Sequence, residues 1–88
     1  MKLKESVVIT SVDDYFVLVD TSPNDDRFNG IIKLNKSGKT MCDFLLKDIT
    51  YEQLVNEMLN VYDVEKSVIE NDINNTINKL KEINLIIL

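Results

Sequence analysis

Short runs of apolar, mostly β-branched residues separated by polar turn residues occupy the first third of the chain, a pattern typical of β-strands. β-Branched residues are frequent in Ser6 to Val12 and in Tyr15 to Val19, which we expect to be two strands. Asp13-Asp14 separates them and has the length of a two-residue hairpin turn. The segment Thr21 to Asn29 holds the single proline and indicates an exposed loop. A third strand is expected from Gly30 to Leu34.

The pattern of apolar residues becomes helical from Asn35 onward, and Asn35 itself is a predicted N-cap. The first helix should end near Lys47-Asp48, and the residues that share one of its faces are Gly38, Met41, Cys42 and Leu45. Thr50 and Gln53 have the spacing of a capping box, which predicts the start of a second helix. The expected apolar face of this helix consists of Tyr51, Leu54, Val55, Met58, Leu59 and Tyr62.

A third helix is predicted from about Glu65 to Asn84. Ser67 with Glu70 matches a capping box better than a start at Asp63 does. The last four residues, 85–88, are apolar and should either pair as a short strand or close the bottom of the core. The apolar stripe of the third helix comprises Val68, Ile69, Ile73, Ile77, Leu80 and Ile83.

Three strands followed by three helices, without strand and helix alternation, predict an α+β fold with a three-stranded antiparallel sheet. A winged helix-turn-helix has this order of elements. A chain of 88 residues can bury one hydrophobic core and is too short for two. We therefore expect residues 1–88 to form a single domain.

Charge and hydropathy argue against two classes of partner. Ten Lys and Arg against fifteen Asp and Glu give a net charge of −5, which repels a phosphate backbone, so we expect no nucleic-acid partner. No apolar run approaches the roughly 20 residues that cross a bilayer, and the N-terminus lacks the apolar stretch of a signal peptide. We therefore expect a cytoplasmic protein with no membrane partner.

Few residues suggest chemistry. The chain has no histidine, which is the commonest general base and metal ligand. Cys42 lies in a helical pattern without a second cysteine nearby, which favours a small buried residue over a nucleophile. Gly30 and Gly38 fit no phosphate-binding loop, and the acidic residues 24–26 lack the later ligands of a calcium loop. We expect no catalytic residue, no cofactor, no metal site, and hence no enzyme.

The stretch from Phe28 to Gly38, FNGIIKLNKSG, resembles the "FNG-hydrophobic-x-LNxTG" signature of the PqqD family, named for the pyrroloquinoline quinone biosynthesis protein D. That family continues with a "T-x-E-x-L-V" helix and a "YDV" turn, similar to Thr50 to Val55 and Tyr62 to Val64. Its last helix and tail are matched by Asp72-Ile73, Ile77, Leu80 and Asn84-Leu85-Ile86.

The resemblance covers roughly residues 14 to 87, with two departures from the family pattern. Cys42 stands where many members have a large aromatic residue, usually Trp, and Thr76 stands where Phe is usual. Both departures remove side-chain volume. Either the core is repacked or the groove has a different shape, so ligand specificity cannot be transferred from relatives.

The resemblance implies a recognition element for ribosomally synthesised, post-translationally modified peptides. In such modules the leader segment of a precursor peptide adds as a strand to the edge of the third strand and lies against the third helix. The implied partners are this leader and a separate modifying enzyme, such as a radical-SAM or lasso-peptide enzyme. The expected leader-binding residues are Gly30, Ile31, Ile32, Lys33, Leu34, Asp72, Thr76 and Lys79.

Physical reasoning supports the edge and leaves its details open. An exposed strand edge binds an extended peptide through backbone hydrogen bonds, so we expect a proline at Ile32 to weaken binding by removing a donor. Asp72, Thr76 and Lys79 are spaced to share one side of a helix. The alternation does not tell which side of the third strand faces the groove. Two alternatives are a winged-helix DNA-binding regulator, which the charge disfavours, and a structural homodimerisation domain that uses the same edge.

Overall fold

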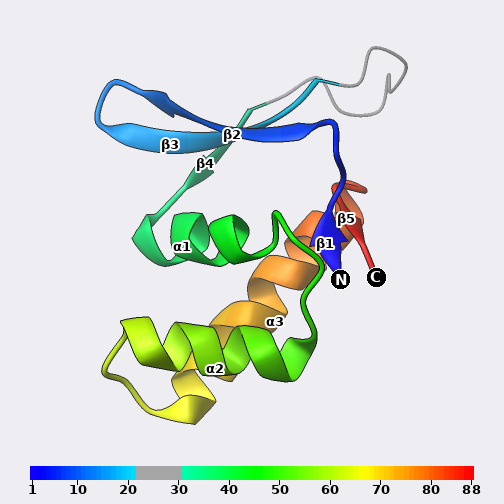
Figure 1. The fold of residues 1–88 in the computed structure, drawn as a ribbon. Helices are drawn as coiled ribbons and strands as arrows, with labels where there is room; N and C mark the ends of the chain where they lie inside the picture. The colour runs from blue at the N-terminus through cyan, green and yellow to red at the C-terminus, as the bar shows by residue number, and fades with distance from the viewer. Residues whose placement is uncertain (22–30) are drawn as a thin grey trace.

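The computed structural model describes residues 1–21 and 31–88, and Figure 1 shows the arrangement of their elements. An antiparallel sheet in the order β2-β3-β4 has the helices on one of its faces. Its strands are β2 (Val7–Val12), β3 (Tyr15–Asp20) and β4 (Ile31–Leu34). The helices are α1 (Lys36–Phe44), α2 (Tyr51–Val61) and α3 (Lys66–Glu82).

This architecture confirms the predicted α+β class, in which a three-stranded antiparallel sheet precedes three helices in winged helix-turn-helix order. β2 and β3 begin and end within one residue of their predicted bounds. Residues 22–29 of the predicted loop lie outside the described residues, and so does Gly30, which was expected to begin the third strand. The described part of that strand is β4.

The apolar C-terminus forms a short strand, β5 (Ile86–Ile87), which pairs antiparallel with β1 (Lys2–Leu3). β1 is not among the strands predicted from the sequence, because two residues are too few to show a strand pattern. Backbone hydrogen bonds hold β1 in place: the Leu3 N–H donates to the Leu45 carbonyl at 2.8 Å and the Lys4 N–H to the Leu85 carbonyl at 3.0 Å. The two ends of the chain therefore lie side by side (Figure 1).

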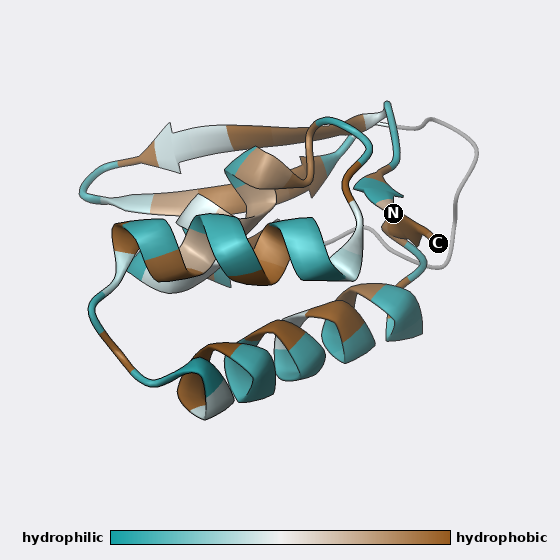
Figure 2. Ribbon diagram, turned by 60° about the horizontal axis from the view of Figure 1, so that its bottom comes forward, coloured by the Kyte–Doolittle hydropathy of each residue, from teal (hydrophilic) through white to brown (hydrophobic). Residues whose placement is uncertain are grey.

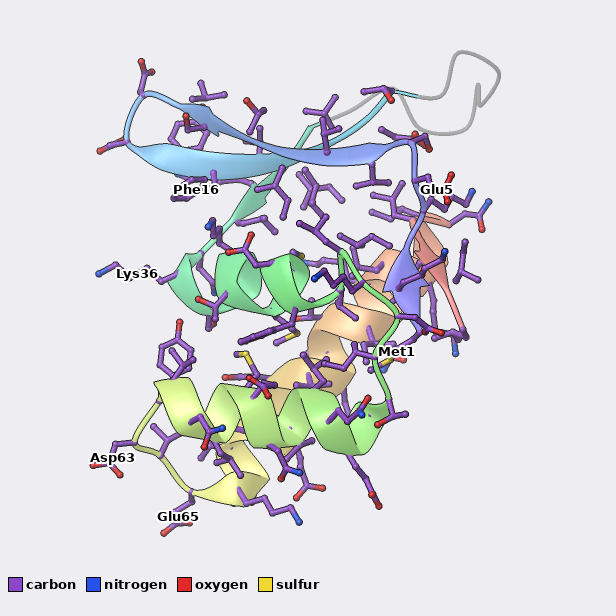
Figure 3. All side chains as sticks on the ribbon, in the orientation of Figure 1. Met1, Glu5, Phe16, Lys36, Asp63 and Glu65 are labelled. Atoms are coloured by element: carbon purple, nitrogen blue, oxygen red, sulfur yellow. The ribbon has the colours of Figure 1, made fainter. Side chains whose placement is uncertain are left out.

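Side chains from the sheet and the helices fill the space between them and form a hydrophobic core (Figure 3). In α3 the apolar band runs along the side that faces the rest of the molecule (Figure 2). Two residues assigned to apolar faces by sequence, Val68 and Tyr51, are instead exposed. Val68 lies at the margin of the α3 apolar face, and Tyr51 is the first residue of α2. The fully buried residues include Leu18, Met41, Cys42, Leu45, Leu54, Met58, Ile73 and Leu85.

The predicted cap of the third helix is wrong, although the helix begins within one residue of the predicted start at about Glu65. Ser67 does not cap α3: it lies within the first turn, and the N-cap is Glu65, whose side chain makes no capping hydrogen bond. The N–H groups of Val68 and Ile69 donate to the Glu65 carbonyl at 3.1 and 3.3 Å. The helix therefore begins before Ser67, and Ile69 packs into the core within its first turn.

The predicted caps of the first two helices are confirmed. Thr50 and Gln53 form the reciprocal capping box of α2, with hydrogen bonds of 3.1 and 3.0 Å. At the start of α1, Asn35 Oδ1 accepts a hydrogen bond from the Gly38 N–H at 2.7 Å. A Cβ atom on residue 38 would lie 2.8 Å from that same oxygen. Glycine at position 38 therefore leaves room for the capping side chain.

We predict that the effect of Gly38→Ala on stability depends on Asn35. Alanine usually stabilises a helix relative to glycine, but here its Cβ displaces the capping side chain, so we expect the free energy of unfolding to fall by about 1 kcal/mol. In the Asn35→Ala background the cap is already absent, and Gly38→Ala should then stabilise by about 0.5 kcal/mol. Urea unfolding of the four proteins checks this, and an equal effect in both backgrounds would contradict it.

Candidate functional site

β4 lies at one edge of the sheet. It pairs with β3, and no described strand lies on its other side. The N–H and C=O groups that point away from β3 along such an edge are available to another extended chain. Which peptide groups of β4 point outward is decided by the pairing of β2 with β3.

Opposite residues of an antiparallel pair alternate between hydrogen-bonded and non-hydrogen-bonded positions. Val12 and Tyr15 pair across the two-residue turn, and the register runs without interruption from there to Val7 and Asp20. Beyond the strands, the N–H of residue 21 donates to the carbonyl of residue 6 at 2.8 Å, in the same register. The odd-numbered residues of β3 therefore direct their peptide groups toward β2, and the even-numbered residues direct theirs toward β4.

Leu18, an even-numbered residue, lies opposite Ile32, so Ile32 directs its N–H and C=O groups toward β3. The neighbours of Ile32 along β4, Ile31 and Lys33, direct theirs toward the open edge. The prediction that a proline at Ile32 removes a donor for a bound peptide is therefore wrong by one residue. The outward-pointing donors belong to Ile31 and Lys33.

The same alternation decides which side chains of β4 face the helices. Ile32 and Leu34 are half-buried and pack against the hydrophobic core. Lys33 lies on the opposite face of the sheet, where its Nζ is 4.6 Å from the centroid of the Tyr15 ring. This resolves the orientation that the sequence alone left open.

A groove of about 400 Å³ lies between β4, the start of α1 and α3. Its residues are Ile32, Lys33, Leu34, Asn35, Gly38, Asn75, Thr76, Lys79 and Leu80. Leu80 is 3% exposed, and with Ile32 and Leu34 it makes an apolar floor. Polar side chains of α3 form one wall. An open strand edge thus borders a groove that has apolar and polar parts.

The structure brings five of the eight predicted site residues together at this groove, namely Ile32, Lys33, Leu34, Thr76 and Lys79. Asp72 is not among the residues that line it and lies one turn earlier on α3. Ile31 contributes outward-pointing peptide groups, and Gly30 lies outside the described residues. That these residues contact a leader peptide stays a prediction.

Sequence reasoning missed four residues of the groove. Asn75 and Leu80 could have been found from helical spacing, since Asn75 is four residues before Lys79 and Leu80 four after Thr76. Asn35 and Gly38 were interpreted only as parts of the first helix. Their place in the groove follows from the packing of α1 beside α3, for which the sequence has no local signal.

Cys42 is fully buried in the core, as predicted. Burial, and to a smaller extent the neighbouring Asp43 carboxylate, raises the pKa of its thiol to about 12. Over residues 1–21 and 31–88 no cluster of three potential metal-ligating side chains occurs. Within the same residues no helix is both long and apolar enough to cross a membrane.

The sequence matches the family model described as Coenzyme PQQ synthesis protein D (PqqD) over residues 7–86, nearly the whole chain. The chain belongs to the PqqD family. This confirms the resemblance inferred from the motifs and extends it to β2. A comparison with curated proteins finds no match to this member of the PqqD family.

Two solved structures share the fold of this PqqD-family chain. One is described as TbiB1 in complex with the TbiA(beta) leader peptide, with 22% sequence identity and a TM-score of 0.76 over 97% of this chain and 93% of that one. The other is described as lasso peptide synthetase B1 complexed with the leader peptide, with 22% identity and a TM-score of 0.68 over 92% and 89% of the two chains. At this identity the comparison establishes a common fold.

We predict that Cys42 is unreactive in the folded protein and that its thiol lowers stability at high pH. The pKa of the thiol rises from an ordinary 9.0 to about 12 on folding, so above about pH 9 the unfolded chain releases this proton first. The free energy of unfolding should therefore decrease as pH rises from about 9 toward 12. Urea unfolding of wild type and Cys42→Ala across this range isolates the contribution, since the variant lacks it. Rapid modification of the native protein by a thiol reagent at pH 8 would contradict the prediction.

Proposed function

We propose that this chain binds the leader segment of a ribosomally synthesised precursor peptide by strand addition to β4 and presents it to a separate modifying enzyme. The observation that carries the proposal is the coincidence of two features. The peptide groups of Ile31 and Lys33 point to the open edge of β4, and the groove between β4 and α3 begins beside that edge. A backbone-binding edge and a side-chain-binding groove therefore adjoin.

Strand geometry gives the open edge of β4 and the groove different roles in binding. A peptide residue paired with Lys33 exchanges backbone hydrogen bonds with it, and this gives affinity without reading sequence. The residues before and after it on the peptide direct their side chains to the helix face of the sheet, since side chains alternate along a strand. There they meet the apolar floor of Ile32, Leu34 and Leu80, which gives selectivity.

The solved structures support this proposal. Both are described as complexes with a leader peptide, and both share the fold of this chain over at least 92% of its length. The residues that carry out recognition in this chain are argued from its own edge and groove, because 22% identity leaves side chains free to differ.

In the proposed role the chain catalyses no reaction itself. By holding the leader and contacting the enzyme, it raises the effective concentration of the core peptide at the enzyme's active site. We place this encounter in the cytoplasm, where the precursor is translated. The family assignment and the absence of a reactive histidine, together with a protonated Cys42 thiol, support a binding role.

We predict that Lys33→Pro weakens leader binding at least tenfold, because proline removes an edge donor and its ring crowds the added strand. Lys33→Ala retains the N–H group and should lose far less affinity. The measurement is isothermal titration of each variant with the leader half of a short precursor peptide encoded beside this gene. Amide shifts of labelled protein would locate the peptide at β4.

A matched control is Ser11→Pro on the other edge strand, β2. Ser11 lies opposite Phe16 in the non-hydrogen-bonded register, so its N–H also points to solvent rather than toward β3. The control should therefore keep both the fold and the affinity. Equal affinity of folded Lys33→Pro and Ser11→Pro for the leader would refute strand addition at β4.

A further inference from the structure

The charged residues that line the groove have one sign. Among its described lining residues these are Lys79 and Lys33, whose ammonium lies on the outer face of the sheet, and no carboxylate is present. The segment 33–39, which continues from β4 into α1, contains three lysines and no acidic residue. The chain as a whole has a net charge of −5, so the positive lining is a local departure from its overall composition.

None of the carboxylates of the described residues lines the groove, although Asp72 lies one turn before Thr76 on α3. Asp43, Asp48 and Glu57 line a separate hollow between the end of α1 and α2. Asp63 and Glu65 lie at the connection between α2 and α3, at the end of the molecule away from the sheet (Figure 3). Charges separated by more than a Debye length, about 8 Å at physiological salt, are largely screened by solvent. The charged residues that line the groove, and that a peptide at β4 meets directly, are therefore lysines.

The two groove lysines are placed on different sides of an added strand. The Lys33 ammonium lies over the Tyr15 ring on the outer face of the sheet, a contact that favours this position. Lys79 is exposed on α3 and lines the groove together with the buried Leu80. Because side chains of a bound strand alternate between these two faces, either lysine can meet a side chain of the peptide.

We infer that the peptide recognised by this groove carries a carboxylate, from Asp or Glu, two residues away from the apolar side chain that enters it. The inference rests on the proposed function and names the chemistry of its ligand. That carboxylate lies on the helix face of the added strand, where it forms an opposite-charge pair with Lys79 at the margin of the groove. A carboxylate on the intervening residue would pair across the strands with Lys33 on the outer face of the sheet. A lysine or arginine at these positions is repelled, so charge also excludes basic segments.

The test is a selection of peptides from a display library of random twelve-residue sequences, performed in parallel on wild type, Lys79→Glu and the control Lys81→Glu. Lys81 is exposed on α3 but does not line the groove, and both substitutions change the net charge equally. Selected peptides are then synthesised, their affinities are measured, and their binding sites are mapped by the amide shifts of Ile31 and Lys33.

We expect wild type and Lys81→Glu to enrich peptides with Asp or Glu two residues away from an apolar residue, and Lys79→Glu to lose this enrichment. Individual acidic peptides should bind Lys79→Glu about tenfold more weakly than wild type, with a smaller difference at high salt. Peptides that bind at β4 without acidic enrichment, or with equal affinity for Lys79→Glu, would overturn the inference and leave leader binding intact. Failure of every selected peptide to shift the β4 amides would overturn both.

Discussion

The two-residue turn at Asp13-Asp14 sets the hydrogen-bonding alternation on which the rest of the structure depends. Asp13 has φ 55°, a left-handed conformation that aspartate tolerates better than most residues, and the turn makes Val12 and Tyr15 a pair. From this pair the alternation extends through β3 to β4. It directs Ile32 and Leu34 to the core and the peptide groups of Lys33 to the open edge. A slip of one residue would reverse every face.

Packing against the helices turns this edge into a site. Asn35 caps α1 directly after β4, and Gly38 gives the cap its space, so that α1 begins close beside the strand. On the other side α3 places Thr76, Lys79 and Leu80 along the groove. The β1 and β5 pair joins the C-terminal end of α3 to the start of the chain, which holds this helix beside the sheet.

The two departures from the family pattern have separate consequences. Cys42 is fully buried, so the loss of a large aromatic residue at this position is a matter of core packing. Thr76 lines the groove, so the loss of an aromatic ring there enlarges the space offered to a peptide side chain. Specificity in this chain is therefore expected to differ from that of relatives with Phe at this position. The lysine lining adds a preference for acidic peptides to this altered shape.

The amino-acid sequence by itself determined the order of elements, the caps of α1 and α2, the burial of Cys42 and the family. These are local features, since capping, turn length and hydrophobic period act within a few residues. Only the tertiary structure decided that Glu65 rather than Ser67 caps α3, that β1 exists, and that Lys33 rather than Ile32 offers its N–H to a partner. It also added Asn75, Leu80, Asn35 and Gly38 to the groove and left Asp72 outside the lining. These properties depend on strand register and on the docking of helices distant in sequence, which no local pattern encodes.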